Sequence, residues 1–209
     1  MTPQEMIRNI EWLGHDSFRI KGSKILYFDP FQIGDAEPAD LVLVTHEHFD
    51  HCSPDDVAKV QGQSTTVITE KDSGAKLSGK VQIVSPGDQI TVEDITIEAV
   101  PSYNIDKSFH PKEKGWLGFI VEMDGVRIYH AGDTDYIPEM SGIRTDIALL
   151  PVSGTYVMTA AEAVEAALAI QPQIAIPMHY GAIVGGSSDA ETFKSALAGK
   201  IEVVVLDKA

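Results

Sequence analysis

The chain has 209 residues, of which 44% are hydrophobic and 22% charged, and its formal net charge is −15. This length and composition predict a single globular domain spanning residues 1–209, and no segment approaches the roughly 18 uninterrupted apolar residues that a membrane span needs. Because so acidic a surface repels phosphate backbones and the basic residues are scattered, the composition disfavours a nucleic-acid partner.

Short apolar runs alternate with shorter helical patterns along the whole chain, which is typical of the α/β class. Strands are predicted at residues 7–13, 17–20, 24–28, 41–44, 66–69, 81–84, 90–92, 95–100, 117–123, 126–130, 146–150, 174–177 and 201–206. So many strands in one domain imply more than one sheet. Helices are predicted at residues 54–60, 71–77, 160–170 and 189–198.

Capping chemistry marks three of the helix starts. Ser53 stands directly before a proline and two acidic residues, which favours a helix N-terminus at that point. Thr159 with Glu162, and Ser188 with Glu191, have the spacing of capping boxes. The first part of the chain is rich in strands, and the last part repeats a strand, helix, strand pattern. We therefore expect two sheets packed face to face, with helices on the outside.

The stretch "LVLVTHEHFDHCSP", residues 41–54, places three histidines and an aspartate directly after a buried strand. The C-terminal ends of strands are where α/β folds bind their ligands. His46 and His48 project the same way in an extended segment, and Asp50 and His51 follow after a turn. Imidazole and carboxylate ligands suit zinc, and also iron or manganese. A solvated loop is the alternative interpretation, but this density of ligands favours a metal site.

The order His46, His48, Asp50, His51 resembles the H-x-H-x-D-H motif of the metallo-β-lactamase superfamily. The resemblance implies a four-layer αβ/βα sandwich that usually holds two divalent metal ions. It also implies three further ligands, which the family places after later strands.

Two of these further ligands have clear counterparts. Asp133 in "HAGDTD" is similar to the family's Gly-Asp-Thr element, and His179 in "IPMHYG" looks like its final histidine. The remaining histidine usually follows a strand closely, but here Tyr103 and Asn104 occupy that spacing. His110 is the only histidine in the interval, so the resemblance assigns it as a ligand on a longer loop.

The resemblance further implies how these ligands divide between the metals. One metal would be bound by His46, His48 and His110, the other by Asp50, His51 and His179, with Asp133 bridging the two.

Four other residues are weaker candidates. His15 lies in "WLGHDSF", which resembles the opening of one branch of the superfamily, where this histidine lies near the pocket; an ordinary turn histidine is the alternative. His130 precedes the Gly-Asp-Thr turn. It either supports a metal ligand or packs in the core, and the sequence favours neither interpretation. Tyr156 and Tyr180 are placed to donate hydrogen bonds to a substrate, or only to pack.

The implied chemistry is hydrolysis by a metal-bound hydroxide, because two bridged metals lower the pKa of water toward neutrality. Asp50 or Asp133 would move a proton to the leaving group. Zinc is the expected metal, with manganese or iron as alternatives. The resemblance is to the lactonase and phosphodiesterase-like branch, so the expected substrate is a small cytoplasmic lactone, ester or phosphodiester.

Three other functions remain open at this point. They are a phosphodiesterase that processes nucleic acids, a metal-binding module without catalysis, and iron-dependent redox chemistry. The single cysteine, Cys52, allows no internal disulfide and favours a reducing cytoplasm. The sequence leaves the oligomeric state undetermined.

Overall fold

A computed structural model describes residues 1–34 and 36–209 and contains two mixed β-sheets. The strands of the first sheet lie in the order β1 (Ile10–Gly14), β2 (Ser17–Lys21), β3 (Ile25–Phe28), β4 (Ala39–Val44), β5 (Gln61–Thr69) and β6 (Lys80–Ile83). Those of the second lie in the order β13 (Glu202–Val203), β12 (Ile174–Met178), β11 (Ile147–Pro151), β10 (Val126–His130), β9 (Leu117–Met123), β8 (Ile95–Pro101) and β7 (Gln89–Val92). In each sheet, antiparallel neighbours at one end give way to parallel neighbours at the other.

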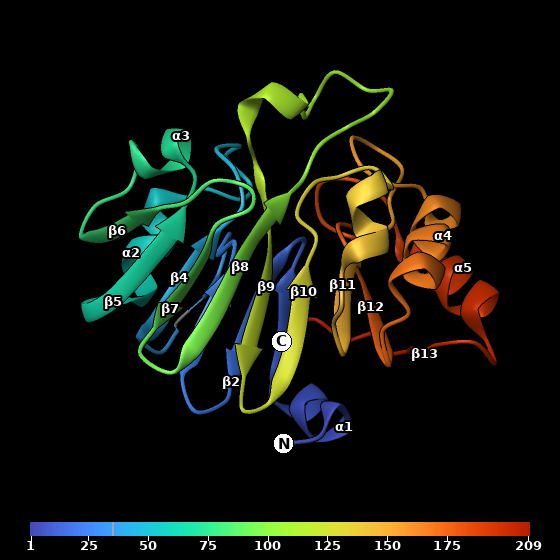
Figure 1. The fold of residues 1–209 in the computed structure, drawn as a ribbon, viewed down its shortest axis with the longest axis horizontal. Helices are drawn as coiled ribbons and strands as arrows, with labels where there is room; N and C mark the ends of the chain where they lie inside the picture. Colours follow the sequence, from blue (N-terminus) through green and yellow to red (C-terminus); the bar gives the residue numbers. More distant parts are fainter. Residues whose placement is uncertain (35) are drawn as a thin grey trace.

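The helices are α1 (Pro3–Met6), α2 (Pro54–Val60), α3 (Lys71–Gly74), α4 (Ala160–Ile170) and α5 (Ser187–Leu197), with 3-10 turns at Ile7–Asn9, Lys112–Lys114 and Pro138–Gly142. Helices α2 to α5 lie on the outer sides of the two sheets, whereas α1 lies at one end of the sandwich beside the N-terminus (Figure 1). α4 packs against β11, and α5 against β12 and β13, on the side opposite α2 and α3. This arrangement confirms the predicted αβ/βα sandwich. None of the helices in the described part of the chain combines the length and the apolar character that a membrane span needs.

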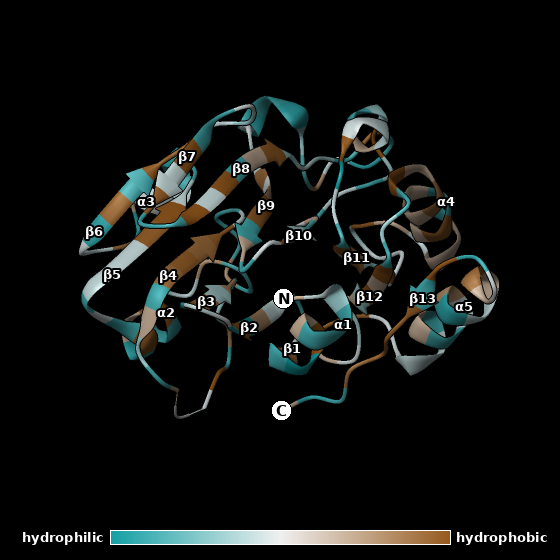
Figure 2. Ribbon diagram, turned by 60° about the horizontal axis from the view of Figure 1, so that its bottom comes forward, coloured by the Kyte–Doolittle hydropathy of each residue, from teal (hydrophilic) through white to brown (hydrophobic). Residues whose placement is uncertain are grey.

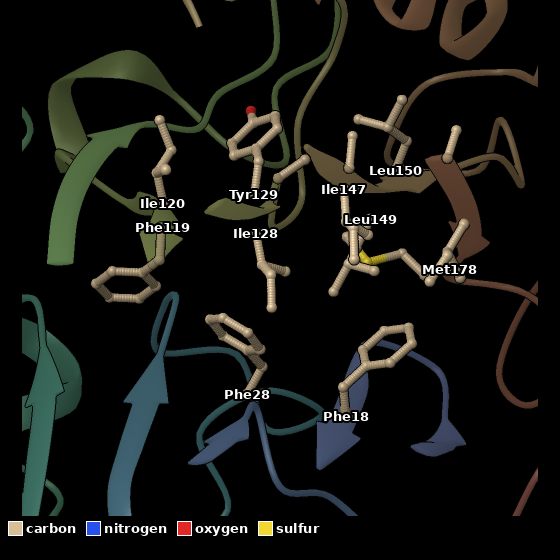
Figure 3. Packing of buried hydrophobic residues seen from close by; sticks show 14 of the residues in the cluster. Phe18, Phe28, Phe119, Ile120, Ile128, Tyr129, Ile147, Leu149, Leu150 and Met178 are labelled. Atoms are coloured by element: carbon tan, nitrogen blue, oxygen red, sulfur yellow. The ribbon is translucent and has the colours of Figure 1, made fainter. Parts of the chain in front are cut away.

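The main core lies between the sheets. Figure 3 shows Phe18 and Phe28 of the first sheet facing Phe119 and Ile128 of the second, and all four side chains are fully buried. Burying an aromatic or aliphatic side chain of this size stabilises a fold by about 1.5–3 kcal/mol. The two sheets are therefore held together by apolar side chains that belong to predicted strands.

β4 is buried on both faces. Leu41 and Leu43 join the core between the sheets, while Val42 and Val44 pack into a second cluster that includes Val57 of α2. In Figure 2 this strand is mostly hydrophobic. Packing on both faces holds β4 in place. The histidine-rich segment that follows it therefore starts from a fixed position.

Several predicted boundaries were wrong at the N-terminus. Residues 3–9 form α1 and a 3-10 turn, so the predicted strand 7–13 begins only at Ile10. The cause is a capping box: Thr2 Oγ1 accepts the Glu5 N–H at 3.2 Å, and the Glu5 carboxylate accepts the Thr2 N–H at 2.8 Å. The first residues therefore turn as a helix before the sheet starts.

Other boundaries shift as well. The predicted helix 71–77 spans only Lys71–Gly74, since glycine is a poor helix former. The N-cap of α5 is Gly186 and not Ser188, because the Gly186 N–H donates to Asp189 Oδ2 at 2.8 Å. The last strand is Glu202–Val203, shorter than the predicted 201–206, because the end of the chain leaves β12 and crosses to β1, where the Ala209 N–H donates to the Trp12 carbonyl.

Candidate metal centre

The C-terminal ends of four strands meet at one rim of the sandwich. The segment after β4 carries four of the seven predicted ligands, and the segments after β8, β10 and β12 carry one each. In Figure 1 the loop between β8 and β9 rises above this rim. The structure brings all seven side chains together, as the following contacts show.

Asp133 lies at the centre of the cluster and is 4% exposed. Its Oδ2 is 3.1 Å from His110 Nε2 and 3.2 Å from His179 Nε2. Its Oδ1 is 3.4 Å from His51 Nε2. One carboxylate therefore contacts histidines from three different segments, and the bridging role that the resemblance implies for it stays a prediction.

His46, His48 and His110 form one group beside Asp133. They offer ligand atoms that all lie within 4.8 Å of one another. His46 Nε2 lies 3.0 Å from His48 Nδ1, and the ring of Trp116 packs against this pair, with centroid distances of 4.8 and 4.7 Å. The loop that carries His110 thus returns to the site despite its length.

A second group lies on the other side of Asp133. His15, His51 and His179 also offer nitrogens within 4.8 Å of one another. Asp50 joins them, because its Oδ2 is 3.1 Å from His15 Nε2 and 3.9 Å from His51 Nε2. This grouping corresponds to the predicted second set, with His15 added to it.

Hydrogen bonds at Nδ1 fix the rings of His46 and His51. Asp29 Oδ2 lies 2.8 Å from His51 Nδ1 and also accepts the Thr45 hydroxyl at 2.6 Å. Since that hydroxyl proton is used, Thr45 Oγ1 accepts from His46 Nδ1 at 3.0 Å. In a neutral ring such a contact keeps the proton on Nδ1 and directs Nε2 into the site.

The two histidines from later segments are held in the same way. Asn104 Oδ1 lies 3.1 Å from His110 Nδ1, and Ser153 Oγ lies 2.9 Å from His179 Nδ1. Four histidines therefore present Nε2 toward one another, with their other nitrogens occupied by oxygen atoms.

Several buried atoms in and beside the cluster make no contact with the geometry of a hydrogen bond in the described part of the chain, even where a charged atom lies within 3.4 Å. They are the Nε2 atoms of His51, His110 and His179, Asp133 Oδ1, and both carboxylate oxygens of Asp16. Burying unpaired polar atoms is costly, and burying an unpaired charge costs more. Divalent cations among these nitrogens and oxygens would satisfy the atoms, so the donor set fits metal ions that bind histidine and carboxylate.

The charged groups of the cluster shift one another's pKa. Burial acts to raise the pKa of Asp133, but the neighbouring His179 and His51 hold it well below the usual range. Burial acts to lower the pKa of His179, and the charges of Asp133 and Asp16 raise it to about 9. Asp133 is therefore a carboxylate at neutral pH, as a metal ligand must be.

The weaker candidates have different positions. His130 is fully buried; its Nε2 lies 2.9 Å from the Asp16 carbonyl, and its Nδ1 accepts the Gly132 N–H at 3.2 Å. Both nitrogens are thus engaged with the backbone next to the cluster. Tyr156 borders the pocket above the site, whereas the Tyr180 ring stacks on Trp12, with centroids 4.9 Å apart, and does not line that pocket.

The sequence interpretation missed Asp16, Asp29 and Ser153. Asp29 directly follows a buried strand, in "YFDP", and this position was an available signal. Asp16 follows His15 and is fully buried. Ser153 carries no local signal, because only the meeting of β11 and β12 brings it to His179.

The fold and the clustered histidines and aspartates define a metal-binding α/β sandwich. Residues 9–179 match the family model described as a β-lactamase superfamily domain. The chain belongs to this family, the metallo-β-lactamase superfamily.

Individual relatives agree with this assignment. A UPF0173 metal-dependent hydrolase of Thermoplasma acidophilum is 38% identical, over 94% of this chain and 93% of its own. A protein of Parabacteroides distasonis with a known crystal structure is 35% identical, with a TM-score of 0.85 over 95% of this chain and 93% of its own. The fold also resembles that of Igni18, a metallo hydrolase of Ignicoccus hospitalis, with 24% identity and a TM-score of 0.77 over 96% of this chain and 95% of that one.

Proposed function

We propose that this protein is a metal-dependent hydrolase that binds two divalent ions and cleaves a small lactone, ester or phosphodiester. The observation that carries the proposal is the convergence on Asp133 of buried Nε2 atoms that lie close to its carboxylate without the geometry of a hydrogen bond. The relative from Thermoplasma acidophilum, named a metal-dependent hydrolase, supports it. Zinc is the metal proposed, with manganese or iron as alternatives for the same ligand types.

The proposed ligands keep the division given above. His46, His48 and His110 would hold one ion, Asp50, His51 and His179 the other, and Asp133 would contact both. When bound, such a pair supplies a hydroxide nucleophile at neutral pH and polarises the oxygen of the scissile group.

Asp50 is the proposed proton carrier. It lines the pocket above the cluster and is partly exposed, whereas Asp133 is buried. Burial acts to raise the pKa of Asp50, but the hydrogen bond from His15 and the charge of His51 lower it. A carboxylate held ionised in this way accepts a proton from water and delivers it to the leaving oxygen. His15 then acts by positioning Asp50.

The bonds of the reaction balance without another reagent. The oxygen of a water molecule forms a bond to the acyl carbon or phosphorus, and the bond to the leaving oxygen breaks. The proton from that water ends on the leaving oxygen, by way of Asp50. A lactone would yield one hydroxy acid, and an ester would yield an acid and an alcohol.

The test combines elemental analysis with a substrate panel. Metal-loaded protein should cleave at least one lactone, ester or phosphodiester, and chelation should abolish the activity. Mutating a residue that hydrogen-bonds a metal ligand lowers metal affinity or activity by about 10–100-fold. Asp133 is itself a proposed ligand, so Asp133→Asn should lower kcat/KM by about 100-fold or more. Two bound metals with no turnover on any of the three substrate classes would favour a metal-binding module without catalysis. Full activity in Asp133→Asn would exclude Asp133 as the shared ligand.

A further inference from the structure

The pocket above the cluster has two different halves. Its volume is about 310 Å³, at the small end of the range for ligand pockets. The first half consists of four of the proposed metal ligands, His48, Asp50, His110 and Asp133. The second half consists of Phe49, Phe109, Tyr156 and Ile183.

The apolar half is exposed to solvent. Phe49 is 70% exposed, Phe109 51%, Ile183 42% and Tyr156 39%. These residues come from four separate segments of the chain, and together they account for half of the large hydrophobic side chains that are exposed in the described part of the chain. Exposed apolar side chains gathered around a cavity mark a binding site, because isolated ones would be scattered over the surface.

Aromatic contacts hold part of this rim in place. The rings of Phe109 and Tyr156 meet edge to face with centroids 4.6 Å apart, which joins the loop after β8 to the loop after β11. Phe49 meets Phe31 in the same geometry at 5.8 Å. Such pairs contribute stability beyond their buried area, so the rim is formed before a ligand arrives.

Cationic side chains do not line the pocket in the described part of the chain. Lysines of the adjacent segments are already paired with acids: Lys107 lies 2.5 Å from Asp135, and Lys114 lies 2.8 Å from Glu47. Sites that recognise phosphate usually supply arginine or lysine to its oxygens. The rim therefore lacks the groups that would favour a phosphodiester.

From these observations we infer that the substrate is an uncharged lactone or ester whose acyl part carries an apolar chain or ring. The reacting carbonyl lies toward His48, Asp50, His110 and Asp133, and the apolar part lies against Phe49, Phe109, Tyr156 and Ile183. This inference rests on the proposed function and selects one of its substrate classes. A second protein as the occupant is less suited, because the apolar residues surround a small concavity that ends on the metal ligands.

The test measures hydrolysis of p-nitrophenyl esters from acetyl to octanoyl by the metal-loaded protein, with bis(p-nitrophenyl) phosphate as the charged comparison. Each methylene that enters the apolar half should raise kcat/KM about two- to fourfold. The phosphodiester should react more slowly than every ester longer than butanoyl. Equal kcat/KM along the series, or preference for the phosphodiester, would overturn the inference.

Matched variants test whether the dependence of kcat/KM on chain length arises at the apolar half of the pocket. Phe109→Ala should lower kcat/KM for the octanoyl ester about tenfold and for the acetyl ester less than twofold, because only the long chain contacts this ring. Ile105→Ala is the control, since Ile105 is 53% exposed on the same loop but does not line the pocket. An equal loss of kcat/KM on both esters in Phe109→Ala would count against the inference. A lower oligomeric state in Phe109→Ala than in wild type, with the chain-length series unchanged, would also count against it, because the apolar half would then bind a second copy of the chain.

A binding measurement separates this inference from the proposed function. Dissociation constants of acetate, butanoate, hexanoate and octanoate for the metal-loaded protein are measured by calorimetry. Tightening with chain length that Phe109→Ala removes would support the apolar subsite even if no ester were cleaved, in which case the hydrolase proposal alone would fail. Affinity independent of chain length would overturn the subsite.

Discussion

Asp16 is fully buried next to the proposed metal ligands, and neither of its carboxylate oxygens has a hydrogen-bond partner in the described part of the chain. Its Oδ2 lies 4.0 Å from His51 Nδ1, and its ligand atoms group with those of Asp29 and His51. Burial raises the pKa of Asp16 well above its usual range. Such a carboxylate destabilises the metal-free protein, and a nearby cation offsets that cost.

Asp16→Asn should therefore have opposite effects on the two forms of the protein. The amide carries no charge, so the metal-free protein should unfold at a higher temperature, while the affinity for metal should fall about tenfold or more. Thermal unfolding in chelator and metal titration measure the two effects. Asp106→Asn, at an exposed position on another loop, is the control. Unchanged metal affinity in Asp16→Asn would show that Asp16 does not act on the bound ions.

The sequence indicated which residues would lie together where several chemical signals are close to one another, and their role as metal ligands stays a prediction. His46, His48, Asp50 and His51 form a dense motif, and all four lie in the cluster. Residues that hold these ligands were harder to predict. Ser153 contacts His179 only through tertiary structure, and Asn104 contacts His110 only because their loop closes on itself, so the residues next to them in sequence gave no indication of these partners.

At the scale of elements, the loop between β8 and β9 explains how a distant histidine reaches the site. The Asn104 N–H donates to the His110 carbonyl at 2.7 Å, and the His110 N–H donates to Asn104 Oδ1 at 3.0 Å. Asp135, just after the Gly-Asp-Thr turn, accepts the Ile105 N–H at 2.9 Å. The loop therefore closes on itself and is attached beside Asp133. Its added length projects outward and leaves His110 at the cluster.

Elements with a strong local signal were predicted correctly. Ser53 and Thr159 cap α2 and α4 as their sequences indicate. All the predicted strands are present, although their ends shift. The ends depend on competition with neighbouring elements: the Thr2 capping box takes residues from the first strand, and pairing with β1 takes the last residues from β13. Neither competitor is visible from strand propensity alone.

At the scale of the whole molecule, His130 connects the two sheets beside the site. It ends β10 in the second sheet, and its ring stacks on Phe28 of the first sheet, with centroids 4.7 Å apart. Its Nε2–H donates to the Asp16 carbonyl, because its Nδ1 accepts from Gly132. Burial lowers the pKa of His130 from its ordinary 6.5, so the ring is neutral in the folded protein at neutral pH.

This burial predicts a dependence of stability on pH. As the pH falls below about 6.5, the unfolded chain takes up a proton at His130 that the folded chain does not, so the free energy of unfolding falls by up to about 1.4 kcal/mol per pH unit from this residue. The loss continues until the pH reaches the lowered pKa of the folded state. Urea unfolding of metal-free wild type and His130→Gln between pH 5 and 7.5 measures it. The curve of wild type should be steeper below pH 6.5, and parallel curves would contradict the account.

The central claim is that residues from four strand ends form one site for two metal ions, with His110 among the ligands. Metal titration of the metal-free protein followed by elemental analysis tests it most directly, with Ile105→Ala as the control on the same loop. The account predicts two ions per chain in wild type and in Ile105→Ala, and one tightly held ion in His110→Ala. Two tightly held ions in His110→Ala, or a single ion in wild type, would contradict it.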